Sequence, residues 1–149
     1  MEKISDKIKR FLTKFFLLDI PKFSKVVVNK SVIENMIDFA KANYPKEFIA
    51  LLSGEVKDDK LIVEGLVYQP YTGTKSSSWM RINLPSPSRV VGSVHSHPSS
   101  STRPSNADLQ FFSKNGVMHF IIGYPYRPTD IACYDLYGER RKFYIDMKN

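Results

Sequence analysis

Cysteine is almost absent from this chain, whose 149 residues include only Cys133. A single cysteine excludes an internal disulfide and any zinc site built from several thiolates. We therefore expect the protein in a reducing compartment, the cytoplasm. Cys133 lies in the alternating apolar segment "DIACYDLY", and we predict that it is a packed strand residue rather than a nucleophile.

The chain also lacks an apolar run long enough to span a bilayer or to form the core of a signal peptide. Residues 1–20 are predicted to form an amphipathic helix, in which apolar residues recur at helical spacing between lysines and which Pro21 ends. Two interpretations stay open for this helix. It packs on the domain or on a second copy in a homodimer, or it makes a weak contact with a membrane surface.

Acidic residues are scarce: 15 Asp and Glu stand against 22 Lys and Arg, which gives a net charge of +7. Such a charge can attract nucleic acid, an acidic membrane surface or an acidic protein. Neither an RNA-binding aromatic signature nor zinc-finger spacing accompanies it. We expect solvated basic surfaces and no nucleic-acid partner.

The composition, with 42% apolar and 25% charged residues, is typical of one soluble globular domain, which we place at residues 21–149. A helix is predicted from a Ser31–Glu34 capping box to the Pro45 region, and a short helix from Ser105 to Gly116. Strands are predicted at residues 25–29, 47–56, 60–68, 79–84, 89–97, 118–125, 130–137 and 140–146. This pattern favours an α+β fold with a mixed sheet flanked by helices.

Two of the three histidines stand in the predicted strand at residues 89–97, in "HSHP". Because side chains alternate along a strand, His95 and His97 face the same side, roughly 7 Å apart along it. Asp108 falls in the first turn of the helix that begins at Ser105, where the helix N-terminus keeps a carboxylate ionised. These three side chains are the candidate metal ligands.

Two histidines and one aspartate leave one coordination position open, which is the pattern of catalytic zinc. Magnesium does not select imidazole, so we expect one Zn²⁺ per chain. Zinc lowers the pKa of its bound water to about 7 and makes a nucleophile at neutral pH. The alternative interpretation is that the histidines are surface residues and that Ser105 and Asp108 only form a capping box. The combined order and spacing favour the metal.

The segment "HSHP", followed after six residues by "SNAD", resembles the H-x-H-P…S-x-x-D core of the JAMM (MPN+) metalloprotease family. Upstream, "YPKEFIALLSG" resembles the family's P-x-E-x-x-x-L-L-x-G segment and puts Glu47 in the matching place. The match runs from about Ser31 to Tyr134, and the combined motif is highly specific. From the residues alone, Glu47 could equally form a salt bridge with Lys46.

The resemblance implies a curved mixed sheet flanked by helices, related to that of cytidine deaminases. It implies that His95, His97 and Asp108 bind zinc, that Glu47 is the general acid and base, and that Ser105 steadies the oxyanion. The implied activity is cleavage after the C-terminal glycine of a ubiquitin-like modifier or sulfur-carrier protein, as in compact archaeal and bacterial members. The Gly-Gly tail would add as a strand beside residues 71–84.

Two other functions stay open. One is an MPN scaffold that does not cleave, and the other is a nucleic-acid-associated protein resembling RadC, which the positive charge supports. Deaminase chemistry is excluded because its zinc signature needs cysteines that this chain lacks. Ser96 is predicted to face away from the metal, and His119 is predicted to be a packed strand residue.

Overall fold

The computed structural model describes residues 21–68 and 89–149. The predicted helix at 1–20 and the predicted strand at 79–84 lie outside these residues. The described elements are β1 (Lys25–Asn29), α2 (Lys30–Asn43), β2 (Ile49–Lys57), β3 (Lys60–Tyr68), β4 (Val90–His97), α3 (Asn106–Phe112), β5 (Met118–Gly123), the 3-10 turn η1 (Pro128–Asp130), β6 (Ile131–Asp135), β7 (Arg140–Arg141) and β8 (Tyr144–Asp146).

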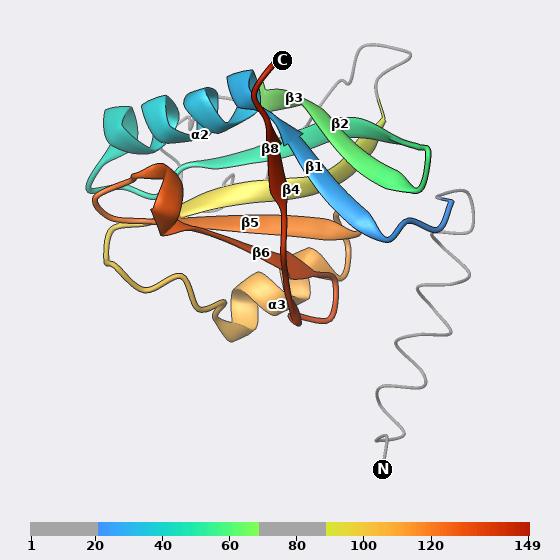
Figure 1. Ribbon diagram of the computed structural model, residues 1–149. Helices are drawn as coiled ribbons and strands as arrows, with labels where there is room; N and C mark the ends of the chain where they lie inside the picture. The colour runs from blue at the N-terminus through green and yellow to red at the C-terminus, as the bar shows by residue number, and fades with distance from the viewer. Residues whose placement is uncertain (1–20, 69–88) are drawn as a thin grey trace.

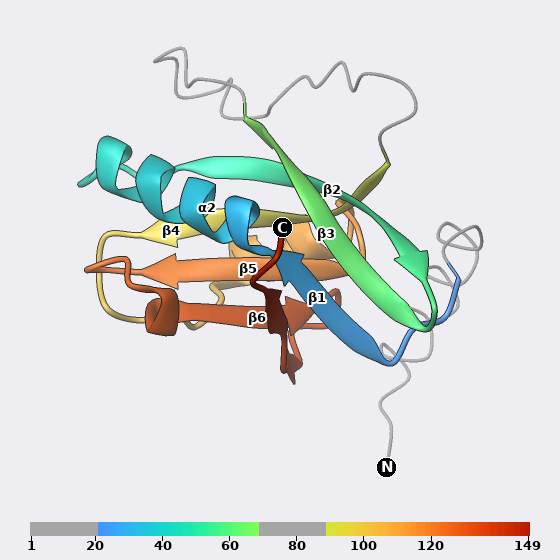
Figure 2. The same cartoon turned by 45° about the horizontal axis from the view of Figure 1, so that its top comes forward.

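The strands form one mixed eight-stranded sheet in the order β7-β6-β5-β4-β2-β3-β1-β8. Strand β4 pairs antiparallel with β2 and parallel with β5. The sheet curls, with α2 above it and α3 below it in Figure 1, and Figure 2 shows α2 crossing in front of the strands. The predicted α+β fold, a curved mixed sheet flanked by helices, is confirmed.

Helix α2 covers one face of the sheet because its apolar residues recur along one side. Its buried residues are Val32, Ile33, Met36 and Ala40. The predicted Ser31–Glu34 capping box is wrong, because the helix follows β1 directly and begins at Lys30 with Asn29 at the N-cap. Ser31 is already inside the first turn, and its backbone N–H donates to the carbonyl of Asn149 at 3.2 Å.

Helix α3 packs on the other face through a smaller apolar cluster. Buried in it are Phe112, Ile121, Ala132 and Tyr134, which come from α3, β5 and β6. Because β5 and β6 are covered on both faces, all their residues are buried, as expected for central strands. This packing fixes the position of α3 against β5 and β6.

The predicted strand at 140–146 is wrong in one respect, since the segment forms two strands instead of one. β7 pairs antiparallel with β6, whereas β8 pairs parallel with β1 at the other edge of the sheet. Between them Phe143 turns into the core, with its ring 5.4 Å from that of Phe120. The curl of the sheet brings its two edges close enough for one short segment to contact both.

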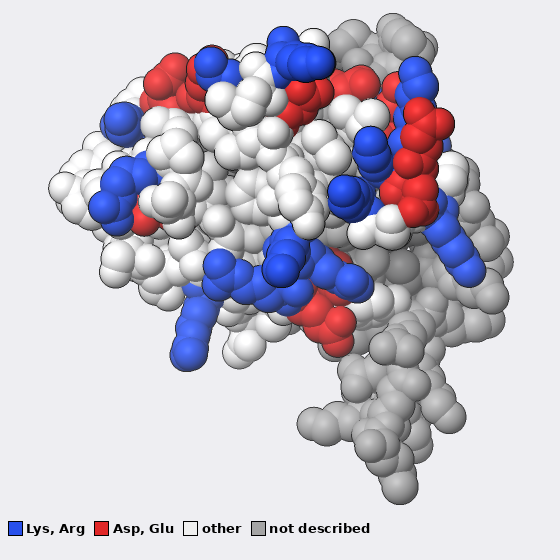
Figure 3. Space-filling model, viewed as in Figure 1, with Lys and Arg blue, Asp and Glu red and all other residues white. Residues whose placement is uncertain are grey.

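Charges on the described surface are mixed. Figure 3 shows side chains of both signs over α2 and a group of Lys and Arg side chains in front of the lower part of β8. Arg140, Arg141 and Lys142 near this segment are all exposed. Within residues 21–68 and 89–149, no helix has the length and apolar character needed to cross a bilayer.

Candidate metal centre

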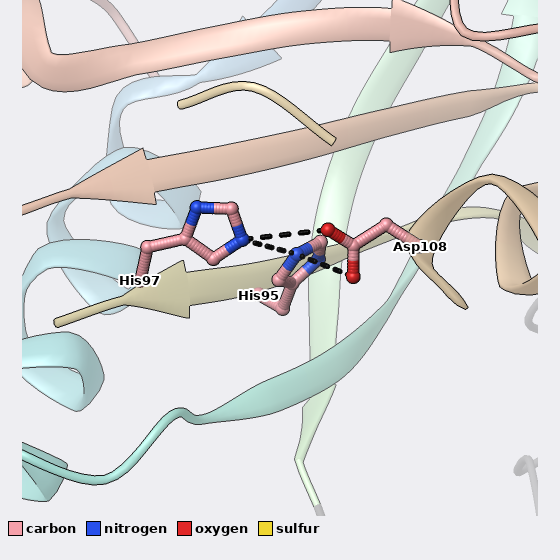
Figure 4. A group of neighbouring side chains, drawn as sticks. All are labelled: His95, His97 and Asp108. Atoms are coloured by element: carbon pink, nitrogen blue, oxygen red, sulfur yellow. Dashed lines mark hydrogen bonds and ion pairs between the residues drawn. The ribbon is translucent and has the colours of Figure 1, made fainter. Parts of the chain in front are cut away.

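His95 and His97 lie on one face of β4, near its C-terminal end, as the alternation along the strand predicts. Their Nε2 atoms are 3.1 Å apart, and both rings point toward Asp108 (Figure 4). His95 is buried and His97 is half-buried, because β2 and β5 flank β4 on its two sides. The central position of the strand therefore holds both imidazoles in place.

Asp108 reaches this pair from the first turn of α3. Its Oδ1 atom lies 3.2 Å from Nε2 of His95, and its Oδ2 atom lies 3.4 Å from Nε2 of His97. The same carboxylate accepts the backbone N–H of Ser105, and the Ser105 hydroxyl accepts the backbone N–H of Asp108. The Oδ2 atom thus accepts from Ser105 and also lies near His97, while Oδ1 lies near His95, so one carboxylate makes both the capping box and the contact with the two histidines.

The three side chains match zinc in chemistry and in spacing. Ligand atoms bound about 2.0–2.1 Å from a tetrahedral zinc lie roughly 3.3 Å from one another. The Nε2–Nε2 distance and the two Nε2–carboxylate distances are 3.1, 3.2 and 3.4 Å. Among the His, Cys, Asp and Glu side chains of the described residues, these three have ligand atoms close enough together to hold a metal ion.

The surrounding loop sets the tautomer of His97. Its Nδ1 atom lies 2.8 Å from the carbonyl oxygen of Ser101, and only an N–H can donate to a carbonyl. The proton therefore resides on Nδ1, and the lone pair of Nε2 faces the site. A metal-binding histidine needs this arrangement.

The electrostatics of the site favour a bound cation. The hydrogen bond with Asp108 raises the pKa of His97, while burial opposes this rise. Burial alone would raise the pKa of Asp108, but hydrogen bonds with His95 and His97 hold it well below its ordinary value. Asp108 is therefore ionised at neutral pH and offers a negative charge to a cation in the site.

Glu47 stands exposed in the connection between α2 and β2. Its charge is a minor contributor to the raised pKa of His97, after the hydrogen bond with Asp108, and to the raised pKa of Tyr126, after burial. The next residue, Phe48, is attached to β4 by two hydrogen bonds. The Phe48 N–H donates to the Ser96 hydroxyl at 2.9 Å, and the Ser96 N–H donates to the Phe48 carbonyl at 3.0 Å.

Ser105 stands at the N-cap of α3 and is exposed. Its hydroxyl oxygen accepts the N–H of Asp108 at 3.1 Å. A serine hydroxyl can accept and donate at the same time, so its proton stays available to an acceptor in front of the site. The three candidate ligands thus converge, Ser105 is hydrogen-bonded to one of them, and Glu47 precedes a residue that is bonded to β4 between the two histidines.

Two tyrosines that support the site were missed by sequence reasoning. The Tyr126 hydroxyl donates to the carbonyl of His97 at 3.1 Å, and the Tyr134 hydroxyl donates to the carbonyl of Thr102 at 2.7 Å. They hold the start and the middle of the loop that joins β4 to α3. An aromatic residue in or near an apolar strand resembles any core residue, so the sequence carries no signal of this role.

Ser96, His119 and Cys133 are placed as predicted. Ser96 is fully buried and points to Phe48. His119 is fully buried, and its ring stacks on Phe112 with centroids 4.4 Å apart. Cys133 is buried in β6, and burial raises the pKa of its thiol, which keeps the thiol protonated and unreactive.

Comparisons with known proteins agree with this geometry. Residues 29–137 match the family model of prokaryotic homologs of the JAB domain. A probable metalloprotease from Haloferax volcanii is 36% identical over 126 residues, which cover 74% of this chain and 75% of that protein.

Two solved structures are similar in fold and sequence. A JAB1/MPN domain protein from Archaeoglobus fulgidus matches with a TM-score of 0.64 and 34% identity, covering 82% of this chain and 98% of that one. A structure described as a metalloprotease-like JAMM zinc site in the proteasome and signalosome matches with a TM-score of 0.63 and 32% identity, covering 83% of this chain and 99% of that one.

Proposed function

Because this chain belongs to the prokaryotic JAB group of JAMM/MPN metalloprotease-like proteins, we propose that it is a zinc-dependent peptidase with His95, His97 and Asp108 as its metal ligands. The observation that carries the proposal is that one ligand atom from each of these three residues lies within 4.8 Å of the other two, with the two Nε2 atoms 3.1 Å apart. Magnesium is a poor candidate because two of the three donors are imidazoles.

The bound zinc would supply a nucleophilic water at neutral pH and polarise the scissile carbonyl. Glu47 takes a proton from the attacking water and delivers it to the nitrogen of the leaving amine. Ser105 donates its hydroxyl proton to the carbonyl oxygen as negative charge develops there. The C–N bond breaks, the carbonyl carbon gains the oxygen of water, and the products are a carboxylate and an amine.

We propose that the bond lies after the C-terminal glycine of a ubiquitin-like modifier or a sulfur-carrier protein. The similarity of the whole motif to the JAMM family supports this substrate class. A Gly-Gly tail has no side chains next to the bond, so nothing on the modifier side hinders the approach of Glu47 and Ser105. The predicted contact of this tail with residues 71–84 lies outside the described residues.

The test is a panel of ubiquitin-like and sulfur-carrier proteins, each ending in Gly-Gly and joined either to a lysine side chain or to a linear peptide. Zinc-loaded wild type should cleave at least one conjugate after the terminal glycine, and a chelator should stop the reaction. Glu47→Gln should lower kcat by about 10²–10⁴-fold and keep its zinc. Glu55→Gln is the matched control, because Glu55 is an exposed glutamate of β2.

Absence of cleavage by zinc-loaded wild type across the panel would contradict the proposal. Zinc binding without turnover would then indicate a scaffold that does not cleave. DNA binding that weakens steeply as salt rises above about 50 mM would instead indicate the nucleic-acid-associated function.

A further inference from the structure

Two exposed tyrosines form a pair beside the proposed active site. Among the described residues, the large exposed hydrophobic side chains are Tyr44, Tyr124, Tyr144 and Met147. Only Tyr44 and Tyr124 of these four contact each other, with ring centroids 4.9 Å apart, and they are 48% and 45% exposed. We call them the tyrosine pair.

The pair joins two segments that are far apart in the sequence. Tyr44 ends α2, and Tyr124 follows β5. Figures 1 and 2 both place the α2–β2 connection and the end of β5 at the left end of the molecule. The backbone N–H of Tyr44 donates to Ala40, and that of Tyr124 donates to Ser99. Both rings therefore project from backbone that is held in place.

Tyr126 connects the pair to the proposed metal ligands. Its buried ring lies 6.2 Å from that of Tyr44 and 5.7 Å from that of Tyr124. Its hydroxyl donates to the carbonyl of His97. Glu47 follows Tyr44 by three residues, and the next residue, Phe48, is hydrogen-bonded to Ser96, which lies between His95 and His97 in β4. The pair thus lies on the Glu47 side of the site.

The inference rests on the peptidase function proposed above, in which the Glu47 side of the site receives the leaving amine. A general acid must lie within hydrogen-bond reach of the atom it protonates. The leaving nitrogen, and the residue that carries it, must then lie on the side of Glu47. The carbonyl oxygen lies toward Ser105.

We propose that the tyrosine pair binds the side chain that carries the leaving amine, namely the methylene stem of an isopeptide-linked lysine. An acylated lysine has no charge, so its four methylenes are the part that an aromatic surface can bind. Lysine stems pack along apolar surface in this way. A linear conjugate that continues with glycine offers no such stem.

The test uses the modifier that wild type cleaves fastest in the panel, joined to one dye-labelled peptide in two ways. In one substrate the bond is to a lysine side chain, and in the other it is to an N-terminal glycine. The double variant Tyr44→Ala/Tyr124→Ala should raise KM for the lysine conjugate about tenfold, which corresponds to about 1.4 kcal/mol. Its KM for the glycine conjugate should change far less, and kcat for both should change little.

Two sets of variants serve as controls. Tyr144→Ala removes a tyrosine of similar exposure, 50%, on β8 at the sheet edge, and should leave both substrates unaffected. Tyr44→Phe and Tyr124→Phe should keep the low KM, because the rings rather than the hydroxyls bind the stem. Zinc content and melting temperature report whether each variant is folded.

The outcomes separate the inference from the proposed function. If wild type cleaves neither conjugate, the proposed function fails. If wild type cleaves both and the double variant keeps the wild-type ratio of kcat/KM for the two substrates, the inference alone is overturned. An equal loss on both substrates would overturn it as well, because a binding surface for the lysine stem must discriminate between them.

Discussion

Histidines on the neighbouring strands β4 and β5 lie in two different environments, which differ in the groups that face their ring nitrogens. In β5, His119 is fully buried, and its ring nitrogens lie 2.6 Å from the Ser93 hydroxyl and 3.1 Å from the Gly116 carbonyl. Because the carbonyl needs a donor, Nε2 carries the proton and Nδ1 accepts the hydroxyl. Burial lowers the pKa of His119 to about 4, so the ring is neutral at pH 7.

In β4, His95 and His97 instead turn their Nε2 atoms toward each other and toward an ionised carboxylate. Within the described part of the chain, one ligand atom from each of these three residues lies within 4.8 Å of the other two. Burial alone therefore does not distinguish a ligand from a core residue. The difference is whether the protein itself satisfies the nitrogen lone pair or leaves it facing a carboxylate and another imidazole.

The largest test of this difference is removal of the carboxylate. Asp108→Asn should weaken zinc binding by more than about 100-fold. Losing a residue that only hydrogen-bonds to a metal ligand already costs about 10–100-fold in metal affinity, and losing the ligand itself should cost more. Zinc competition with a fluorescent chelator measures the affinity.

Asp130→Asn is the matched control, because the Asp130 carboxylate likewise accepts the backbone N–H of the N-cap residue, Arg127, but its ion pair is with that arginine instead of with a histidine. Its zinc affinity should equal that of wild type. Equal losses in both variants would mean that Asp108 acts only as a helix cap.

The second test uses the low pKa of His119. A pKa lowered from 6.5 to about 4 stabilises the fold above pH 6.5, and this stability is lost as the pH falls toward 4. About 2 kcal/mol should be lost between pH 7.5 and pH 5 in wild type. His119→Gln should lack this part of the loss.

Urea unfolding with a chelator present at both pH values measures the difference, and the groups common to both proteins cancel. The absolute stability of His119→Gln does not matter, because only the change with pH is compared. Parallel pH dependence of the two proteins would show that His119 is not held neutral.

The third test compares two buried hydroxyls of β4. Ser96→Ala leaves the Phe48 N–H without its acceptor and should cost about 1–2 kcal/mol of stability. It should also lower kcat, because Glu47 adjoins Phe48, and keep zinc. Ser93→Ala should cost similar stability, because it removes the hydroxyl bonded to His119, and keep kcat. If both variants keep kcat, Ser96 does not position Glu47.

The smallest effect on the fold is expected from removing the metal itself. A chelator should abolish cleavage and leave the far-UV circular dichroism spectrum unchanged, because the core of the sheet is apolar and built without the site. A zinc finger, by contrast, unfolds without its metal. Loss of the β signal on chelation would mean that the centre is structural.

Local patterns predicted much of the fold. The strand at 60–68 has the predicted bounds, and the turn before it has Asp58 and Asp59 at positive φ. The Ser105–Asp108 capping box is present as predicted. In these cases the deciding interactions lie within a few residues of one another, and sequence reasoning can find them.

The errors lie where distant residues decide. The start of α2 depends on β1, which runs directly into it, and on the carbonyl of Asn149. The division of residues 140–146 depends on Phe120 and on both sheet edges. At the site, the histidines and Asp108 could be chosen from spacing, whereas Glu47 required the family resemblance. Tyr126 acts through a contact 29 residues away and gave no local sign.

The division of the last described segment has a consequence for the order in which the protein folds. Residue 27 of β1 pairs with residue 144 of β8, so β1 lacks one neighbour until nearly the whole domain has been synthesised. Pairings of such long range slow folding, because the chain must close a large loop before it gains the contact. A chain that ends before residue 140 should therefore leave the β1 edge of the sheet without the β8 neighbour, and that edge becomes paired only when residues 144–146 are available.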